Sequence, residues 1–473
     1  MLLRLRTPTF RWSLRSTSNA HLYPHPSSSF HLSLSSSIQP QVSGILDGDC
    51  DGFLPWLERK AGSRISSALS IGKSPYGRAL FASRIIHMGE CILQVPYSVQ
   101  ISVDNLLPEI RSLISNGVGN ISKLAVVILV EQKLGRDSEW DPYISCLPQQ
   151  GQLHNTIFWS ASELDMIRIS SVYQETINQK SQIEKDFLAM RPVFESLLKS
   201  FGEFTFRDFM HACTLVGSRA WGSMKGLSLI PFADFLNHDG VSEAIVMSDD
   251  DKQYSEVTAD RDYALGEQVL IRYGKFSNAT LMLDFGFTLP YNNYDEVHIQ
   301  LDIPKHDHLH EPKMELLRRY FVRPTKDVKG LSNSVNSFII KEVTSTRGKG
   351  KGLPQSLRAF ARVLSCTSPQ ELKDLAMEAA QTDGRLARRP LRNINKEIEA
   401  HLMLSSLFAK LISEHSEAIL SLESFNAPSL GTKLAVRRTM ARDLLAGELR
   451  ILKSASAWLD NYCSSLTGQC IHC

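Results

Sequence analysis

Four short segments of the chain carry side chains that could do chemistry. A glycine lets backbone approach a ligand closely, an arginine can clamp a carboxylate, and polar residues inside an apolar stretch must be hydrogen-bonded if buried. A tyrosine that ends a strand is either core packing or the edge of a catalytic site. The segments are Tyr76-Gly77-Arg78-Ala79; Ser218-Arg219-Ala220-Trp221; Ile230 to His238, with Asp234 and Asn237; and Gly266 to Tyr273, followed by Ser277, Asn278 and Phe285.

Strand signals surround the first and last of these segments. Short strands are predicted over 79–82 and 91–95, with a turn at 88–90 between them. Strand signals return between residues 227 and 303, and they are clearest at 268–273 and 297–303. The last two segments are therefore expected to lie in a β region.

Helical signals form an insert and a long C-terminal block. The apolar spacing is helical from about 103 to 218, so a helical insert is expected to split the β region. Ser277 is typical of the N-cap of a short helix over 278–285, which Gly286 would close. From about 312 onward the chain reads as almost wholly helical, either a bundle that supports its neighbour or a docking surface for a protein partner. The clearest helical runs are 53–60, 121–134, 184–201, 397–423 and 433–462.

Length and composition exclude several classes of protein. The chain has 473 residues, of which 43% are hydrophobic, with 52 Lys and Arg against 50 Asp and Glu. This length predicts two or three domains, and the composition excludes disordered, collagen-like and disulfide-scaffold proteins. No apolar run approaches the roughly 18 residues of a membrane span. The near balance of charge argues against nucleic acid as the main partner.

The first 46 residues are typical of an organelle transit peptide. They contain four arginines, no lysine and no acidic residue before Asp47, and ten of the first forty positions are serine. The early arginines favour the mitochondrion and the serine block at 27–37 favours the plastid, so the leader alone leaves both open. The alternative is an ordinary disordered tail.

Cysteine and histidine clusters do not predict a metal site. The first five of the eight cysteines are scattered and are expected to be reduced, mostly buried thiols. The tail with Cys463, Cys470, His472 and Cys473 crowds its ligands into one chain end, and His306-Asp-His308-Leu-His310 lacks a fourth ligand. No metal is expected at either place.

Taken together and in this order, the four segments resemble the SET-domain methyltransferases, and most closely the Rubisco large-subunit lysine methyltransferase family. The insert motif Trp140-Asp-Pro-Tyr143-Ile-Ser-Cys-Leu-Pro148, the long helical insert and the helical domain that follows support this branch. The resemblance covers Phe53 to the C-terminus and is strongest over 227–287. The combination of Asn237-His238 with a strand-ending Tyr273 is specific, whereas each part alone is not.

The resemblance implies an α+β fold: a SET-domain β fold with a long helical insert, followed by an α-helical C-terminal substrate-binding domain. It implies S-adenosylmethionine as cofactor and Tyr273 as the catalytic tyrosine. Arg219 would face the cofactor's carboxylate, Asn237 and His238 would hold its amino group and adenine, and Asp234 would lie near the lysine channel or the cofactor. The implied cofactor-binding residues are Tyr76, Gly77, Arg78, Ala79, Arg219, Asp234, Asn237, His238, Tyr273, Ser277, Asn278 and Phe285.

Three positions depart from the family pattern. The usual second glycine of the first motif is Ala79, which adds a methyl group to the expected pocket wall. The family's Asn-His-Ser is Asn-His-Asp here, with Asp239 one residue past the important pair. Phe285 stands where close relatives have tyrosine, so a hydroxyl near the methyl-transfer channel is lost. The number of methyl groups transferred is left open.

The expected chemistry needs no metal. A lysine amine has a reference pKa near 10.4, so deprotonating it at pH 7 costs roughly 5 kcal/mol. A sulfonium cation and a low-dielectric channel both lower that pKa. A tyrosine hydroxyl can then align the lone pair of the neutral amine without adding charge, and in-line geometry supplies much of the rest.

The sequence therefore predicts an organellar protein-lysine N-methyltransferase. The expected organisation is a transit peptide over 1–46, a SET catalytic domain over 47–303 with its insert at about 103–218, and a helical Rubisco-methyltransferase-type substrate-binding domain over 304–473. We expect a monomer in the chloroplast stroma, or alternatively in the mitochondrion, that docks a folded protein on the helical domain and binds neither nucleic acid nor membrane. The alternatives are a protein-histidine N-methyltransferase and a non-catalytic binding module with a SET fold.

Overall fold

The chain divides into two compact units. Unit 1 comprises Met1–Leu147, Pro192–Glu203 and Arg219–Tyr273, and unit 2 comprises Pro148–Arg191, Phe204–Ser218 and Gly274–Cys473. Tyr76 and nearly all of the expected transit peptide lie outside the residues that the structure describes. The structure is a computed structural model that describes residues 45–46, 50, 52–75, 77–223, 226–320, 336–345, 350–382, 385–387, 389–424 and 432–470.

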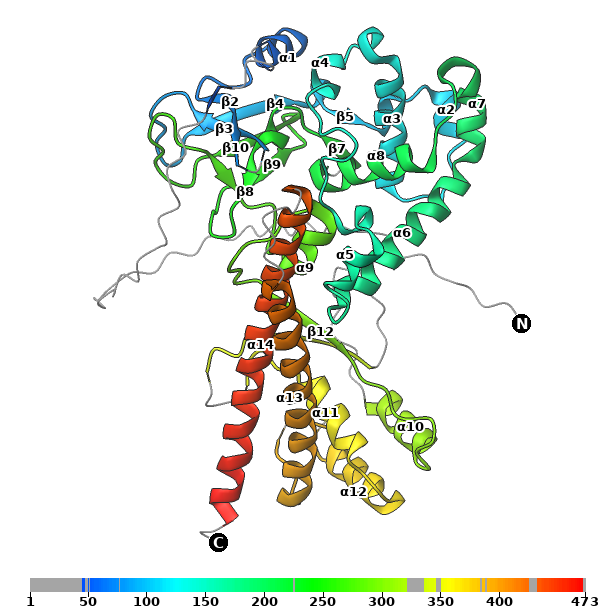
Figure 1. The fold of residues 1–473 in the computed structure, drawn as a ribbon, viewed down its shortest axis with the longest axis vertical. Helices are drawn as coiled ribbons and strands as arrows, with labels where there is room; N and C mark the ends of the chain where they lie inside the picture. The colour runs from blue at the N-terminus through cyan, green and yellow to red at the C-terminus, as the bar shows by residue number, and fades with distance from the viewer. Residues whose placement is uncertain are drawn as a thin grey trace. The chain divides into compact units, whose positions relative to one another are not determined.

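Unit 1 is built from small sheets of short strands (Figure 1). Three antiparallel sheets have the orders β1-β2-β3, β4-β10-β9 and β5-β7-β6, and β8 pairs with β11 in parallel. The predicted strands at 79–82 and 91–95 are confirmed as β3 and β4. The strands are β1 (Ile45–Leu46), β2 (Leu69–Ser74), β3 (Gly77–Ala82), β4 (Cys91–Pro96), β5 (Ile101–Ser102), β6 (Ala220–Ser223), β7 (Gly226–Leu229), β8 (Asn237–His238), β9 (Val246–Asp249), β10 (Tyr254–Thr258) and β11 (Leu270–Ile271).

The prediction of one strand over 268–273 is wrong in extent. Only Leu270–Ile271 forms β11, beside β8. The preceding residues bond to β3 instead, since Gln268 forms an isolated bridge with Phe81 and the Val269 amide donates to the Leu80 carbonyl at 2.9 Å. The segment thus changes partner partway along, so the strand that carries Tyr273 is short and the tyrosine lies two residues beyond its end.

Helix α1 (Phe53–Ala61) confirms the predicted first helix and packs on apolar rings. Phe53 and Leu57 are buried one turn apart, and Gly62 ends the helix in the left-handed conformation, with φ 65°. The Phe53 ring lies 5.3 Å from the ring of Phe235 and 6.3 Å from that of Tyr143. The helix therefore supports the two segments that carry these aromatic residues.

The helical insert is confirmed between β5 and β6, with one break that was not predicted. The expected helix over 184–201 is two helices, because α6 ends at Ala189 and α7 begins at Arg191. Pro192 has no amide hydrogen, and its ring clashes with the carbonyl four residues earlier, so a continuous helix cannot pass through it. The insert helices are α2 (Pro108–Ser112), α3 (Asn120–Leu134), α4 (Asp141–Ile144), α5 (Ala161–Asp165), α6 (Ser171–Ala189), α7 (Arg191–Phe201) and α8 (Phe206–Arg219).

Unit 2 contains a strand pair of which one strand was predicted: β12 (Glu296–Gln300) overlaps the strand expected at 297–303, whereas β13 (Ser337–Lys341) was not expected. β13 lies where the chain was expected to be helical, and it pairs with β12 in antiparallel register, with Val297 opposite Ile340. Phe338 and Ile340 are buried on alternate positions, which is the period of a strand. The elements of this region are α9 (Asn278–Thr280), β12 (Glu296–Gln300), α10 (His310–Tyr320), β13 (Ser337–Lys341), α11 (Gln355–Leu364), α12 (Pro369–Ala380), α13 (Ile394–Ser424) and α14 (Thr432–Cys470).

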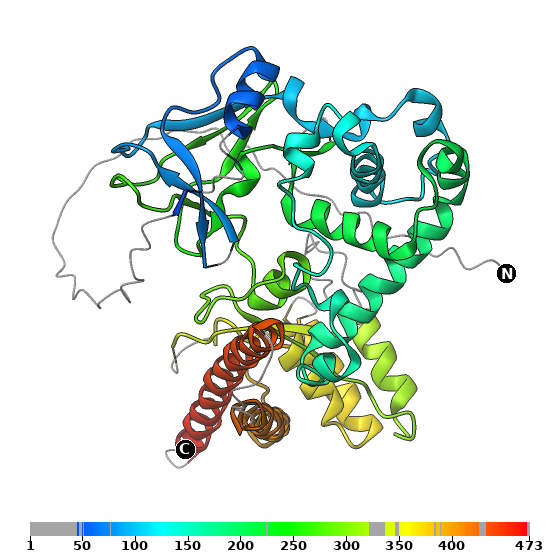
Figure 2. The same ribbon diagram turned by 45° about the horizontal axis from the view of Figure 1, so that its top comes forward.

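The two longest helices, α13 and α14, lie side by side (Figures 1 and 2). They confirm the predicted amphipathic runs and extend them at both ends. Leu404 and Phe408 of α13 and Leu452 and Trp458 of α14 are buried in one apolar core with residues of α11 and β13. No helix among the described residues has the length and apolar character needed to cross a bilayer.

Candidate active site

The parallel pair β8–β11 brings Asn237 and His238 beside the segment that ends on Tyr273. Asn237 lies opposite Leu270 and His238 opposite Ile271. The pairing continues for one residue, because the backbone amide of Asp239 donates to the Ile271 carbonyl at 2.9 Å. Two segments more than thirty residues apart therefore meet at backbone distance.

Tyr273 is held at this junction through its backbone and its hydroxyl. Its amide donates to His238 Nδ1 at 3.1 Å, and its hydroxyl donates to the Leu236 carbonyl at 2.6 Å. The Trp221 ring meets the tyrosine ring edge-on, with centroids 6.4 Å apart. Burial raises the pKa of the Tyr273 hydroxyl above its ordinary value, so the group is neutral at physiological pH.

His238 is neutral at the same pH. Burial lowers the pKa of its imidazole to about 4, and the nearby Asp239 offsets this only in part. The neutral ring accepts the Tyr273 amide at Nδ1, which assigns its proton to Nε2.

Asp234 is a fully buried carboxylate close to the same junction. Its Oδ2 accepts the Tyr143 hydroxyl at 2.8 Å and lies 3.9 Å from Arg219 Nε. Burial raises the pKa of Asp234 to about 6, although Arg219 and Tyr143 both oppose the rise. Its Oδ1 is buried and has no hydrogen-bond partner among the described residues. An unmatched acceptor of this kind suits an ammonium or hydroxyl donor of a ligand.

A strained turn positions Asp234. Phe232 has φ 75° and ψ −47°, close to the γ-turn region that bulky residues rarely adopt. Its side chain is fully buried, and the short 3₁₀ turn Ala233–Phe235 follows directly. Strain of about 1–3 kcal/mol at such a residue persists only where the surrounding packing enforces it, and it is common at functional sites.

The segment Gly77 to Ala79 opens β3 and contacts the Asn237-His238 pair. Gly77 has φ 108°, and no described atom lies within 4 Å of the position that a Cβ would take. The Arg78 carbonyl accepts Asn237 Nδ2 at 3.4 Å, while its guanidinium donates to the Cys146 carbonyl. Ala79 is completely buried. The segment thus offers backbone that a ligand can approach, joined to the Asn-His pair by one hydrogen bond.

Of the predicted site residues, eight lie in unit 1: Gly77, Arg78, Ala79, Arg219, Asp234, Asn237, His238 and Tyr273. Contacts join them, from Asn237 to Arg78, from Arg219 to Asp234 and from His238 to Tyr273. Tyr76 lies outside the described residues. The other three predicted residues, Ser277, Asn278 and Phe285, belong to unit 2.

In unit 2 these three residues build one local turn. Ser277 caps the helix through the Thr280 amide at 3.4 Å, as predicted. The Asn278 side chain exchanges two hydrogen bonds of 2.9 Å with the backbone of Leu289, so its amide holds a loop in place. Phe285 packs its ring 5.5 Å from that of Phe276.

Two residues of the site were not predicted to take part in it. Tyr143 lies in the motif from Trp140 to Pro148, but spacing alone did not indicate that its hydroxyl reaches Asp234. Phe232 gives no signal at all, because a positive φ at a phenylalanine cannot be read from residue type.

The site residues fit the methionine end of S-adenosylmethionine. That group carries an ammonium and a carboxylate, and the site places a buried, unmatched carboxylate oxygen of Asp234 near the guanidinium of Arg219. The open backbone at Gly77 allows close approach. No group of three or more His, Cys, Asp or Glu in the described part of the chain is arranged to hold a metal ion.

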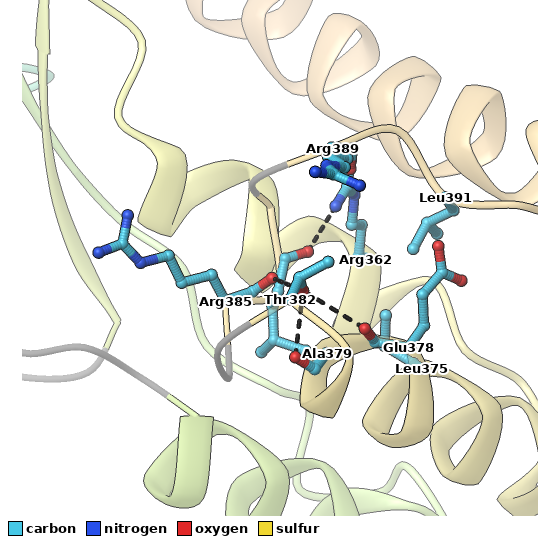
Figure 3. A pocket seen from close by; sticks show the side chains of 9 residues that line it. Arg362, Leu375, Glu378, Ala379, Thr382, Arg385, Arg389 and Leu391 are labelled. Carbon is cyan, nitrogen blue, oxygen red and sulfur yellow. Dashed lines mark hydrogen bonds between the residues drawn. The ribbon is translucent and has the colours of Figure 1, made fainter.

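A recess in unit 2 is a structural feature of a different kind (Figure 3). It holds about 230 Å³ of space, part of it open to solvent, and none of the predicted site residues. Arg362 donates to the carbonyls of Leu386 and Arg389, so it fixes the backbone around the recess. The lining residues are Arg362, Leu375, Glu378, Ala379, Thr382, Arg385, Leu386, Arg389 and Leu391.

Curated proteins related to this chain are methyltransferases. The actin-histidine N-methyltransferase of Dasypus novemcinctus is 27% identical over 443 residues, which are 88% of this chain and 70% of that protein. The chloroplastic fructose-bisphosphate aldolase-lysine N-methyltransferase of Arabidopsis thaliana is 27% identical over 327 residues, which are 66% of this chain and 65% of that protein.

Solved structures and family models agree on the architecture. Rubisco LSMT bound to AdoMet has a TM-score of 0.67 at 21% identity and covers 89% of this chain and 93% of its own. Rubisco LSMT bound to sinefungin and monomethyllysine has a TM-score of 0.68 at 20% identity, with the same coverage. These likenesses show the fold and confirm the predicted α+β class. A SET domain model matches residues 77–274 and a Rubisco LSMT substrate-binding model matches residues 304–452. The chain therefore belongs to the SET-domain protein methyltransferases, in the branch that carries the Rubisco LSMT substrate-binding domain.

Proposed function

We propose that the chain is an S-adenosylmethionine-dependent protein-lysine N-methyltransferase. The observation that carries the proposal is the junction of β8 with β11, where the buried Tyr273 hydroxyl is fixed on the Leu236 carbonyl beside the Asn237-His238 pair. This arrangement offers a neutral hydroxyl oxygen beside a parallel backbone pair. Those features suit the alignment of a neutral amine.

The proposed mechanism depends on orientation. S-adenosylmethionine supplies, when bound, an electrophilic methyl group. The Tyr273 hydroxyl donates a hydrogen bond to the Leu236 carbonyl, so the hydroxyl oxygen can accept an N–H of the substrate amine. This bond fixes the direction of the amine lone pair in line with the methyl group. Burial keeps the hydroxyl neutral by raising its pKa, so the hydroxyl itself adds no negative charge that would hold the amine in its protonated form.

The proposed cofactor-binding roles follow the same geometry. We assign the methionine end to Tyr76, Gly77, Arg78 and Ala79, its carboxylate to Arg219, and the amino group and adenine to Asn237 and His238. Asp234 supports the site through its unmatched oxygen. Tyr273, Ser277, Asn278 and Phe285 complete the proposed set.

The proposed organisation keeps the boundaries expected from the sequence. Residues 1–46 are a transit peptide, 47–303 the catalytic domain and 304–473 the domain that docks a folded protein substrate. The serine-rich, acid-free leader supports an organellar place, and the chloroplastic relative in Arabidopsis thaliana supports the chloroplast stroma rather than the mitochondrion. We propose that the enzyme acts there as a monomer.

The test is methyl transfer from labelled S-adenosylmethionine into stromal and mitochondrial extracts. The wild-type chain is expected to label a protein band, and Tyr273→Phe to reduce the initial rate on the order of 100-fold, because the amine loses its orientation. S-adenosylhomocysteine affinity should change little, because phenylalanine keeps the aromatic ring and removes only the hydroxyl that is proposed to orient the amine. Tyr263→Phe is the matched control, since this buried tyrosine donates to Asp260 at 3.0 Å and is not among the proposed site residues.

Three other outcomes would contradict the proposal at different points. Cofactor binding without any labelled band would favour a non-catalytic binding module. Absence of cofactor binding would reject the site assignment. Full activity of Tyr273→Phe would reject the catalytic role of its hydroxyl.

Protein-histidine methylation is the second candidate, because the actin-histidine N-methyltransferases match 88–90% of this chain at 26–27% identity. Lysine methylation is the main proposal, since the predicted resemblance is to the lysine-modifying branch. Fragment-ion mass spectrometry of the labelled protein separates the two, because it places the methyl group on a lysine amine or on an imidazole ring.

A further inference from the structure

Two cysteines far apart in the sequence meet in unit 1. The Cys50 and Cys146 sulfur atoms lie 3.0 Å apart, although 96 positions separate the two residues. Both side chains are buried. A disulfide bond has a sulfur–sulfur distance of about 2.05 Å, so an approach of roughly 1 Å would join them.

The two cysteines are close in sequence to residues that contact the proposed active site. Cys146 follows α4, whose Tyr143 hydroxyl bonds Asp234, and its carbonyl accepts the guanidinium of Arg78. Cys50 precedes α1, whose Phe53 ring packs on Tyr143. A bond between the two sulfurs would tie the start of α1 to the end of α4.

The other described cysteines provide internal comparisons. Cys91 is exposed, and its pKa is raised by partial burial and by the neighbouring Glu256. It can therefore report on oxidation of an accessible thiol whose contacts in the described part of the chain are with Leu93 and Glu256. Cys213, Cys366 and Cys463 are buried.

We propose that Cys50 and Cys146 are a reversible disulfide site that is oxidised by thiol–disulfide exchange with a small or protein disulfide. With glutathione disulfide, two cysteine S–H bonds break and one S–S bond forms. The glutathione S–S bond is cleaved and takes up both protons and both electrons as two glutathione thiols. The reaction needs no other reactant.

The bond stabilises unit 1 chiefly by restricting its unfolded chain. It closes a loop of nearly one hundred residues, and the entropic benefit of a cross-link grows with loop length. The folded chain already holds the two sulfurs in contact, at 3.0 Å. Burial and the neighbouring thiol raise the pKa of Cys146, so exchange is slow at neutral pH and accelerates as the pH rises.

The experiment uses the full chain incubated at pH 8.5 with a graded series of reduced and oxidised glutathione. After free thiols are blocked, peptide mapping is expected to find a Cys50–Cys146 linked peptide that disappears on reduction. The melting temperature should be higher by several degrees in the oxidised form. Cys50→Ser and Cys146→Ser should each abolish that rise, whereas Cys91→Ser should retain it.

Two results would contradict the proposal. Oxidised protein that carries only glutathione adducts, or a stability rise that persists in Cys146→Ser, would overturn it. Where a serine variant does not fold, Cys50→Ala and Cys146→Ala replace it, and a linked peptide in the wild-type chain remains decisive. Loss of methyl-transfer activity has no bearing on these readouts, so this proposal and the proposed function fail separately.

Discussion

The buried carboxylate of Asp234 sits between one strong and one weak partner. The Tyr143 hydroxyl bonds it at 2.8 Å, but Arg219 Nε, at 3.9 Å, is beyond the range of a good hydrogen bond. Removing a carboxylate from water costs more than these contacts return, so burial raises its pKa to about 6. At the residue scale, the site therefore contains a carboxyl group that titrates close to neutrality.

Asp234→Asn should change how stability depends on pH. A folded-state pKa above the ordinary 3.8 means that the folded protein holds this proton more tightly. The resulting stability is present in full below about pH 4 and is lost as the pH rises through about 6. Asparagine has no such proton. As the pH rises from about 4 to about 6, the free energy of unfolding of the variant should therefore increase relative to that of wild type, by up to roughly 3 kcal/mol. Urea unfolding at intervals from pH 4 to pH 7.5 measures this difference.

Asp260→Asn provides a control of opposite sign. Burial alone would raise the pKa of Asp260, but Ser242 and the backbone amides of Glu243 and Ala244 hold it below its ordinary value. That carboxylate contributes stability above its ordinary pKa and loses it as the pH falls. Its removal should therefore cost stability at pH 7 and little in acid. Parallel curves for the two variants would mean that the folded protein lowers the pKa of Asp234, and a difference from wild type that does not change with pH would mean that Asp234 titrates like a solvated carboxyl.

At the scale of elements, the turn after Ser277 depends on one glycine. α9 continues into a π-helical turn, Leu281–Phe285, which Gly286 ends with φ 78°. A Cβ at Gly286 would lie 2.7 Å from the side-chain oxygen of Asn155 and 2.9 Å from its backbone nitrogen. Asn155 is itself fixed, because its side chain donates to the Leu283 carbonyl at 3.1 Å. Both the backbone angle and the space therefore require glycine.

Gly286→Ala should destabilise unit 2 more than a strained glycine in open space. Gly151→Ala is the matched control, because Gly151 has φ 90° and no described atom lies within 4 Å of the place where its Cβ would stand. We expect about 1–2 kcal/mol for the backbone strain of Gly151→Ala. The contact with Asn155 should add roughly 1–3 kcal/mol in Gly286→Ala. Equal losses of unfolding free energy in urea would show that the neighbouring chain relaxes around the methyl group.

The same elements show which local signals predict structure and which do not. Ser277 and Gly286 were readable because a cap and a left-handed terminator depend on residue type at one position. β13 was missed because two alternating apolar residues, Phe338 and Ile340, are too short a signal in a region of helical spacing. The break at Met190 was also readable in principle, from the proline two residues later.

The site was only partly predictable for a different reason. Nothing local in the sequence indicates that Asn237 pairs with Leu270, since a two-residue parallel pair has no periodicity of its own. The resemblance to a family supplied that proximity. The hydroxyl of Tyr143 reaches Asp234 across 91 positions, and the strain at Phe232 depends on packing from several elements. Such contacts are properties of the fold and not of a segment.

At the scale of the whole molecule, the C-terminal helices meet at a buried carboxylate. Glu397 of α13 is fully buried and accepts Arg362 of α11 at 2.6 Å and the Tyr462 hydroxyl of α14 at 2.7 Å. Burial alone would raise the pKa of Glu397, but Arg362 holds it below its ordinary value. One side chain therefore joins three helices of the proposed substrate-binding domain.

Glu397→Gln should loosen that domain as a whole. Removing one partner of a buried ion pair leaves the Arg362 charge uncompensated, which costs about 3–5 kcal/mol. We expect a lower unfolding midpoint in urea and weaker labelling of a folded protein substrate. Glu399→Gln is the matched control, because Glu399 lies on the same helix, is exposed and pairs only with Lys396, at 2.8 Å among the described residues. An exposed pair of this kind contributes about 0–1 kcal/mol, so this control should unfold like wild type. If Glu397→Gln also unfolds like wild type, the carboxylate does not hold the three helices together, and their apolar core alone must account for the domain's stability.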